Sequence, residues 1–250
     1  NAGGSQSYES LRHSAWNGLT PCDLVFPFFL FIMGISTYIA LRKFDFQPSA
    51  PVIRKILKRT VLILLIGWAI GWFDFACEGD FFPFAHLRLT GVLPRIALCY
   101  CVASLLALYV NHKRLAWIAG ILLVGYAVLL CMGNGYACDE TNILSVADRG
   151  ILGTEHLYRK SPIDPEGLVS TLSAIAHTLI GFCCGALMLK KDTPLETRIL
   201  KLAVAGFLLM AVGFLLTEAF PLNKRIWSPT FVLVTCGLAA MLQATLTYFI

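Results

Sequence analysis

Residues 24–41 read LVFPFFLFIMGISTYIAL, eighteen consecutive residues without a charged side chain. A stretch of this length matches the hydrocarbon core of a lipid bilayer, which is about 30 Å thick. Lipid offers no hydrogen-bond partner to the backbone, so a spanning segment must satisfy its N–H and C=O groups internally, as a helix does. The stretch therefore predicts a transmembrane helix.

Six further apolar blocks follow it, separated by short polar loops. The seven predicted spans are Leu24–Leu41, Leu57–Phe73, Val92–Val110, Leu115–Met132, Leu168–Leu189, Ile199–Thr217 and Pro229–Ile250. The chain is 57% hydrophobic and 14% charged, with a mean hydropathy of +0.72, whereas soluble domains carry about 25% charged residues. The strict alternation of a membrane β-barrel strand is absent. We therefore predict an all-α, polytopic transmembrane helix bundle that forms one domain over residues 1–250.

The distribution of charge predicts the orientation of this bundle. The loops after the first, third and fifth spans contain twelve Lys and Arg but three Asp and Glu, while the opposite side contains seven basic loop residues and twelve acids. Because an excess of basic residues marks the cytoplasmic face, residue 1 and the loop 133–167 are predicted to lie outside and Ile250 inside. The net charge of +5 is then explained by basic residues on the predicted cytoplasmic side. We therefore expect no nucleic-acid partner.

The two ends and the cysteines give further expectations. Residues 1–12 are polar and contain no signal peptide, so an external N-terminus predicts a preceding span, and we expect truncation at both ends. The nine cysteines show no zinc-binding spacing, so no metal site is predicted. Cys77 and Cys138 fall in outer loops, where an oxidising compartment would allow them to pair; free thiols are the alternative.

Three helix starts lie on the predicted outer side. Thr20-Pro21-Cys22-Asp23 offers a Thr N-cap, a Pro at the first helical position and an acid at the third. Asp164-Pro165-Glu166 and Ser228-Pro229 repeat this logic for the fifth and seventh spans. Ordinary capping explains all three. The alternative is that their free N–H groups surround one polar pocket that binds an oxyanion or a carboxylate.

The densest group of polar side chains lies in residues 11–23, LRHSAWNGLTPCD. His13 can exchange a proton near neutral pH, Asn17 offers both a donor and an acceptor, and Asp23 adds a carboxylate at the membrane edge. Trp16 is typical of a membrane interface. A histidine in a loop is more often structural than catalytic, so these residues alone leave the choice open.

Segments in the same order over nearly the whole chain resemble the heparan-α-glucosaminide N-acetyltransferase family. They are His13–Thr20, Asp23–Pro27, Phe31–Gly34, Leu89–Ile96, Asp148–Arg149, His156–Tyr158, Asp164–Leu168, Ser170–Leu172, Pro221–Lys224 and Trp227–Ser228. The His-x-x-Trp-Asn-Gly and Asp-Pro-Glu-Gly segments are the specific ones. The chain departs from the family in lacking a preceding helix with an Asp-x-x-Arg-Gly start and the C-terminal helices. Position 94 is Pro where the animal enzyme has Gln, and the loop 133–167 is shorter.

The resemblance implies an acetyl-CoA-dependent N-acetyltransferase that moves an acetyl group from cytosolic acetyl-CoA to an amino-sugar acceptor outside. The family's active-site histidine falls on His13, which would hold the acetyl group as a covalent intermediate or act as a general base. Asp23 is the second catalytic candidate. The expected surroundings are a lipid bilayer, with a bacterial inner membrane as the location, and a homo-oligomer is left open.

Eight more polar residues on the outer side are candidates for substrate binding. They are Asn17, Arg95, His156, Asp164, Glu166, Asn223, Lys224 and Trp227. Arg95 lies about one turn inside a span, where an ion pair with Asp23, Asp164 or Glu166 is the alternative. Asp164 would otherwise be an N-cap, whereas Glu166 is expected to point freely across the outer mouth. A sugar could stack on the turn at residues 223–227, or that turn could be an interfacial anchor.

Three other classes remain as alternatives. A transporter or channel-like permease for a small polar or sugar substrate predicts polar residues at mid-membrane, where we find His177 and expect it to be a neutral packing residue. A membrane scaffold predicts small-xxx-small helix faces but gives no reason for the group His13, Asn17 and Asp23. An O-acyltransferase of the other large multi-span family would carry its own arginine- and histidine-containing signature, which this sequence lacks.

Overall fold

The computed structural model describes residue 8, residues 11–158 and residues 161–250, and this part of the chain contains helices and no strand. In chain order the elements are η3 (Pro21–Leu24), α1 (Val25–Arg42), α2 (Ala50–Cys77), η4 (Pro83–Ala85), α3 (Val92–Tyr109), α4 (His112–Met132), α5 (Ile143–Leu152), η5 (Thr154–His156), α6 (Thr171–Met188), α7 (Leu195–Leu215), η6 (Leu216–Glu218) and α8 (Pro229–Phe249). Seven of the described helices are long and apolar enough to cross a membrane. The prediction of an all-α bundle with seven spans is confirmed. Glu9, Arg159 and Lys160, which enter the charge count above, lie outside the described residues.

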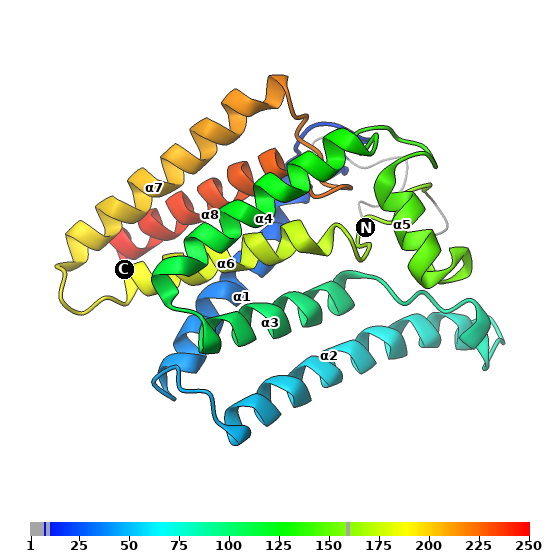
Figure 1. Ribbon diagram of the computed structural model, residues 1–250, viewed down its shortest axis with the longest axis horizontal. Coiled ribbons are helices and arrows are strands. Elements are labelled where there is room, and N and C mark those ends of the chain that lie inside the picture. The colour runs from blue at the N-terminus through cyan, green and yellow to red at the C-terminus, as the bar shows by residue number, and fades with distance from the viewer. Residues whose placement is uncertain (1–7, 9–10, 159–160) are drawn as a thin grey trace.

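The long helices lie side by side, and their connections alternate between the two ends of the bundle (Figure 1). α6 occupies the centre, because it packs against α1, α3, α4, α7 and α8 and is the most buried of the seven spans. α2 lies at the edge, packs chiefly against α3 and is the most exposed span. The buried surface of α6 is therefore the core on which the other spans assemble.

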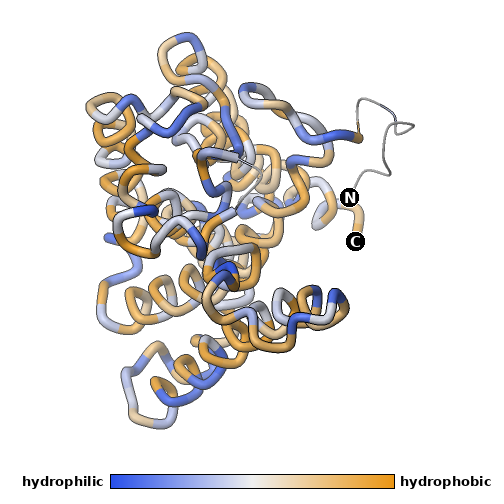
Figure 2. Tube along the Cα trace, turned by 90° about the vertical axis from the view of Figure 1, so that its right-hand side faces the viewer, coloured by the Kyte–Doolittle hydropathy of each residue, from blue (hydrophilic) through white to orange (hydrophobic). Residues whose placement is uncertain are grey.

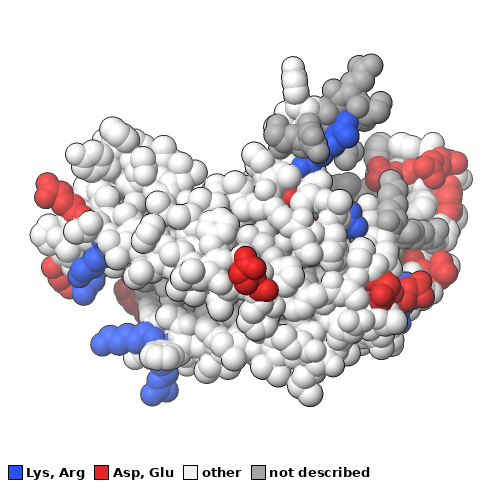
Figure 3. All heavy atoms as spheres, turned by 90° about the horizontal axis from the view of Figure 1, so that it is seen from above, with Lys and Arg blue, Asp and Glu red and all other residues white. Residues whose placement is uncertain are grey.

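The two ends of the bundle differ in charge. We call one the acidic end, formed by residues 11–20, 78–91, 133–158, 161–170 and 219–228, and the other the basic end, formed by residues 43–49, 110–111 and 189–194. Figure 3 shows charged side chains gathered at both ends, while the surface between them is white apart from an acidic patch near its centre. Viewed onto the acidic end, the loops contain hydrophilic stretches while the helices behind them are mainly hydrophobic (Figure 2). This banded distribution is typical of a bundle whose middle faces lipid.

Three helices begin earlier than their apolar blocks, and all three begin at the basic end. α2 starts at Ala50 rather than at Leu57, α4 at His112 rather than at Leu115, and α7 at Leu195 rather than at Ile199. The first two turns of these helices contain Lys and Arg residues that extend the helix past the apolar core. Long basic side chains tolerate this position because their charged heads reach water. Hydropathy alone therefore places these starts too late.

Glycines allow the closest helix crossings. A Cβ added at Gly181 of α6 would collide with the carbonyl oxygen of Phe31 in α1, and one added at Gly34 would collide with the α6 backbone. In the α7–α8 pair, a Cβ at Gly237 would lie 2.6 Å from the carbonyl oxygen of Gly206. Small residues at such positions let membrane helices approach closely. The small-residue faces are thus used within this chain, and they let the middle of α1 pack directly against α6.

The loop 133–167 contains a short helix, α5, that the sequence analysis did not anticipate. Its N-cap is Asn142, whose side chain accepts a hydrogen bond from the Leu144 N–H at 2.9 Å. The same side chain donates to the carbonyl oxygens of Gly135 and Ala137 at 2.7 and 2.9 Å. These bonds anchor α5 at the acidic end and turn its Asp148 toward the interior, where that side chain is 1% exposed.

Candidate functional site

The buried carboxylate of Asp23 organises the start of the first span. The N–H and hydroxyl groups of Thr20 donate to Asp23 Oδ2 at 3.2 and 3.0 Å, and the Ser14 N–H donates to the same oxygen at 3.1 Å. Thr20 is the N-cap of η3, and Pro21 follows as its first residue. The capping predicted for Thr20-Pro21-Cys22-Asp23 is confirmed. It occupies one carboxylate oxygen and leaves the other free for a different partner.

That partner is His13, and we call the group His13, Cys22, Asp23 and Lys224 the His13 cluster. His13 Nδ1 lies 2.7 Å from Asp23 Oδ1, and Lys224 Nζ lies 3.1 Å from the same oxygen. A carboxylate only accepts, so Nδ1 carries the imidazole hydrogen, and Nε2 of the neutral ring keeps its lone pair. Lys224 Nζ is also 3.1 Å from Nδ1, but both are donors, and they share the carboxylate.

The unprotonated nitrogen of His13 faces accessible space. The His13 side chain is 57% exposed, whereas Asp23 is fully buried. Cys22 Sγ lies 3.7 Å from His13 Nε2. The cluster therefore presents an accessible base whose ring is oriented from behind by a buried carboxylate, which is the arrangement general-base catalysis requires.

Asn17 and Asn223 join the N-terminal segment to the turn before α8. Asn223 Nδ2 donates to Asn17 Oδ1 at 3.1 Å, and the Gly18 N–H donates to the Leu222 carbonyl oxygen at 2.8 Å. Asn223 is fully buried, and its Oδ1 also accepts from the Ile226 N–H at 3.2 Å. The structure thus brings these two predicted residues together, and their contact places Lys224 beside Asp23.

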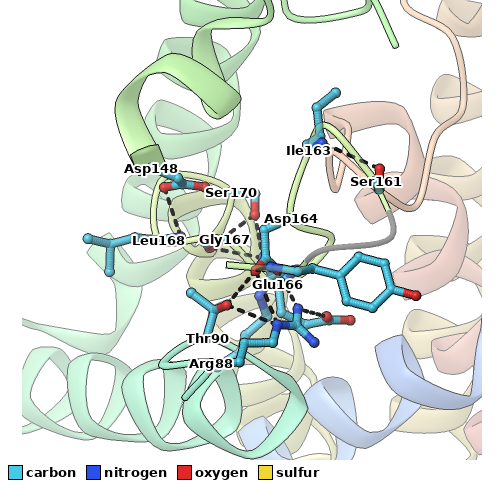
Figure 4. Close-up of polar contacts among 12 residues, drawn as sticks. Arg88, Thr90, Asp148, Ser161, Ile163, Asp164, Glu166, Gly167, Leu168 and Ser170 are labelled. Atoms are coloured by element: carbon cyan, nitrogen blue, oxygen red, sulfur yellow. Dashed lines mark hydrogen bonds and ion pairs between the residues drawn. The ribbon is translucent and has the colours of Figure 1, made fainter. Parts of the chain in front are cut away.

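A second cluster lies at the same end, and we call Arg88, Thr90, Asp164 and Glu166 the carboxylate clamp. Figure 4 shows Arg88 reaching both carboxylates: Nη2 pairs with Asp164 Oδ1 and with Glu166 Oε2, the latter at 2.7 Å, and Nε donates to Asp164 Oδ2 at 3.2 Å. Thr90 Oγ1 donates to Asp164 Oδ2 at 2.5 Å. Burial alone would raise the pKa of Asp164, but the hydrogen bonds and charge of Arg88 outweigh burial and hold that pKa below its ordinary value.

Two expectations for this segment are wrong. Asp164 is not the N-cap of the fifth span, because α6 begins at Thr171 with Ser170 as its N-cap. The Asp164 side chain instead accepts from the backbone N–H groups of Glu166 and Tyr158, at 2.9 and 2.8 Å. Glu166 does not point freely across the outer mouth, because Arg88 holds it. The sequence analysis gave Arg88 no role, so both carboxylates were assigned without their main partner.

The turn at residues 167–170 delays the start of α6. Asp148 Oδ1 accepts from the N–H groups of Leu168 and Val169, both at 3.1 Å, while Arg95 Nη2 donates to the Gly167 carbonyl oxygen at 3.1 Å and to Ser170 Oγ. These bonds occupy the backbone groups that a helix would use, and Figure 4 shows the Asp148 contacts beside the carboxylate clamp. Burial raises the pKa of Asp148 to about 6, helped by the nearby charge of Asp164 and opposed by the two backbone N–H groups.

Arg95 bonds the turn at residues 167–170 and lies against Trp227, and it forms no ion pair among the described residues. Its guanidinium lies 5.1 Å from the centroid of the Trp227 ring, a cation–π contact. The ion pair expected with Asp23, Asp164 or Glu166 is therefore not found in the described part of the chain. Trp227 is 1% exposed and packs edge-on against Phe26 and Phe231. It offers neither an open face for a sugar nor an interfacial anchor, so both expectations for this ring are wrong.

His156 holds a loop rather than joining the His13 cluster. Its Nδ1 donates to the Leu87 carbonyl oxygen at 2.8 Å, and its own carbonyl oxygen accepts from the Leu89 N–H at 3.0 Å. Beside it is a cavity of about 620 Å³, lined by the last turns of α2, the segment 86–94 and Leu157–Tyr158. Arg88 lies over the Tyr158 ring, 4.8 Å from its centroid, so the carboxylate clamp forms part of the cavity wall.

Sequence reasoning missed four residues, of which three belong to these clusters and one, Asp148, bonds the turn beside the carboxylate clamp. They are Cys22, Arg88, Thr90 and Asp148. Arg88 had a usable signal, because it is one of the few basic residues on the acidic side. Asp148 had a weaker one, a carboxylate within the apolar stretch of a short amphipathic helix. Thr90 lies in the segment Leu89–Ile96 that carries the resemblance, whereas Cys22 carries no signal beyond its position beside Asp23.

Comparison with known proteins gives two results. Residues 12–114 match the model of a domain family of unknown function, DUF5009. The heparan-alpha-glucosaminide N-acetyltransferase of Mus musculus is 24% identical and that of Homo sapiens is 25% identical, each over 92% of this chain and 43% of the relative. The chain thus spans less than half the length of these relatives. The resemblance seen in the sequence is confirmed, and the chain is a distant relative of these N-acetyltransferases.

Proposed function

We propose that this protein is a transmembrane N-acetyltransferase, which transfers the acetyl group of acetyl-CoA, its co-substrate, to the amine of an amino sugar. The His13 cluster is the observation that carries this proposal, because it combines an accessible base with a buried orienting carboxylate. The relatives' name specifies a glucosaminide acceptor, which supports an amino sugar or a glycan that ends in one. The excess of carboxylates at the acidic end also favours an ammonium substrate.

The chemistry assigns a separate role to each member of the cluster. A sugar ammonium has no lone pair, so it must lose a proton before its nitrogen can attack a carbonyl carbon. His13 Nε2 takes that proton, and Asp23, bonded to Nδ1–H, stabilises the imidazolium that forms. Lys224, held at Asp23, supplies the positive charge that stabilises the oxyanion developing during acyl transfer.

The proposed geometry relative to the membrane follows the charge bias. The acidic end faces the non-cytoplasmic side, and acetyl-CoA is drawn from the cytosol, so the acetyl group crosses the bilayer through this bundle. A bacterial inner membrane is the proposed location. The polar side chains concentrate at one end rather than at mid-membrane, which supports chemistry at that end over transport of the acceptor.

The test is replacement of His13 by Ala in the purified protein. We expect kcat for glucosamine-dependent release of free CoA from acetyl-CoA to fall by roughly 10²–10⁴-fold, the contribution of general acid–base catalysis. The melting temperature should not change, because the side chain is mostly exposed. The matched control is His86→Ala, which removes a histidine that pairs with Asp80 at the same end and should keep its activity. Activity of His13→Ala within a few-fold of wild type would refute the assignment.

A further inference from the structure

Cys22 is the neighbour of the free nitrogen of His13. Its Sγ lies 3.7 Å from Nε2, which is within reach of an S–H···N hydrogen bond. The Asp23 contact fixes the hydrogen on Nδ1, so Nε2 is the atom that can accept the thiol proton. Cys22 is partly exposed and unbridged, so neither burial nor a disulfide removes it from chemistry.

Cys22, His13 and Asp23 therefore repeat the order nucleophile, base and orienting carboxylate. In such an arrangement the base lies within hydrogen-bond reach of the nucleophile, and a third group fixes the base from behind. The distances here are 3.7 Å from sulfur to Nε2 and 2.7 Å from Nδ1 to the carboxylate. Cys22 is the second residue of η3, so its side chain is held at the start of the first span directly beside Asp23.

We propose that Cys22 is a covalent acyl carrier, which accepts the acetyl group of an acyl thioester before it passes to the amine. This inference rests on the proposed function and assigns the intermediate within it. The ligand class is an acyl thioester, and His13 acts as the base for both half-reactions instead of carrying the acetyl group itself.

The two half-reactions balance. In the first, the Cys22 thiol proton moves to His13 Nε2, and the sulfur attacks the thioester carbonyl carbon. The Sγ–C bond forms, the bond from that carbon to the CoA sulfur breaks, and the CoA thiolate leaves with the proton from Nε2. In the second, the free amine of the acceptor attacks the Cys22 thioester, the N–C bond forms and the Sγ–C bond breaks. The amine proton passes through Nε2 to the Cys22 sulfur, which restores the thiol.

The energetics favour a cysteine at this position. Exchange of one thioester for another is close to thermoneutral, so the acetyl group can be loaded without loss of its transfer potential. Attack by an amine on a thioester then yields an amide, which is the more stable product. A thiolate is also intrinsically more nucleophilic than the oxygen nucleophiles of proteins.

The first experiment looks for the intermediate. The purified protein is mixed with acetyl-CoA without an acceptor, quenched in acid and analysed by peptide mass spectrometry. We expect one acetyl group on the peptide that contains Cys22, removed by neutral hydroxylamine, and none in Cys22→Ser or His13→Ala. Cys77 and Cys138, both exposed, are internal controls for non-enzymatic acylation and should stay unmodified. Equal acetylation of all three cysteines, or acetyl on His13 and not on Cys22, would overturn the proposal.

A second experiment separates this inference from the proposed function, because it requires no acetyl transfer. The rate of Cys22 alkylation by iodoacetamide is compared with the rates of Cys77 and Cys138. We expect Cys22 to react faster, and expect His13→Ala to slow it by roughly 10²-fold, at the lower end of general-base effects. Alkylation of Cys22 at the rate of Cys138, unaffected by His13→Ala, overturns the thiol–imidazole pair.

Glucosamine-dependent CoA release that survives both Cys22→Ser and Cys22→Ala overturns the carrier role but retains the proposed enzyme. Acetylated Cys22 that never transfers to an amine supports the carrier and refutes the acceptor.

Discussion

The burial of the Asp148 side chain opposes its ionisation, and this should make the stability of the protein depend on pH. Its side chain is 1% exposed, and its pKa rises from the ordinary 3.8 to about 6. The folded state therefore binds the proton more tightly than the unfolded state does. The stability gained from the protonated form is complete below pH 3.8, declines as the pH rises to about 6 and is absent above it. At about 1.4 kcal/mol per pH unit, this difference is worth about 3 kcal/mol.

Replacing Asp148 by Asn should remove this dependence on pH. The amide oxygen can still accept from the N–H groups of Leu168 and Val169, but no charge forms near neutral pH. We expect the variant to melt at a higher temperature than wild type at pH 8 and at a similar temperature at pH 4, in the same detergent. The lowered pKa of Asp164 has the opposite effect, because its contribution to stability is lost as the pH falls. Wild type and Asp148→Asn both contain Asp164, so this contribution does not change the comparison. A difference that does not change between pH 4 and pH 8 would show that the ionisation of Asp148 does not control stability.

Individual residues also show how far the sequence can reach. His13, Asn17 and Asp23 were selected from one short stretch, and the structure brings Asn223 and Lys224 to them across 206 and 201 positions. For Asn223 and Lys224, placement on the predicted outer side sufficed to nominate them. The partner of Asp164 could not be nominated in this way, because Arg88 lies 76 positions away and no local pattern links the two. Trp227 was misjudged for a related reason, since burial depends on neighbours from several helices.

At the scale of the helices, hydropathy predicted each span but not its full length. The helices α2, α4 and α7 extend into basic segments, where propensity and solvated side chains continue the helix after the apolar block has ended. The opposite error occurs at α6, where Asp148 and Arg95 take the backbone partners of residues 167–170. Both errors have the same origin. A helix ends where its backbone hydrogen bonds end, whereas hydropathy indicates only which part of the helix lies in the hydrocarbon core.

The crossing of α1 and α6 should depend on Gly181. Alanine there gains up to about 1 kcal/mol of helix propensity, but its Cβ would collide with the Phe31 carbonyl oxygen, a backbone atom that cannot turn aside. We expect Gly181→Ala to destabilise the bundle by roughly 1–3 kcal/mol, the usual effect of overpacking, measured by thermal unfolding in detergent. Gly120→Ala is the matched control, because no atom lies within 4 Å of its added Cβ, and it should be neutral or slightly stabilising. If both variants melt alike, the close contact does not limit packing.

The two ends of the whole molecule differ in charge, and a mainly apolar surface separates them. Spans assembled on α6 bring the loops of the acidic end together, and both the His13 cluster and the carboxylate clamp are built from those loops and from the helix η3 at the start of the first span. The basic end contributes no member to either cluster. Which end faces the cytoplasm therefore decides on which side of the membrane the proposed chemistry takes place.

Thiol labelling in intact cells tests that orientation. Cys138 is exposed at the acidic end, and Gln47 is exposed in the loop between α1 and α2 at the basic end. Because the connections and adjoining helix ends at the basic end carry twelve Lys and Arg against three acids, we expect this end in the cytoplasm. An impermeant maleimide should then label native Cys138 in intact cells, and should label a Gln47→Cys variant only after permeabilisation, as read by peptide mapping.

The reverse pattern would place the His13 cluster in the cytosol beside acetyl-CoA. Acyl transfer would then require no passage across the bilayer, and the bundle would act as a membrane anchor for the site instead of a path through the membrane.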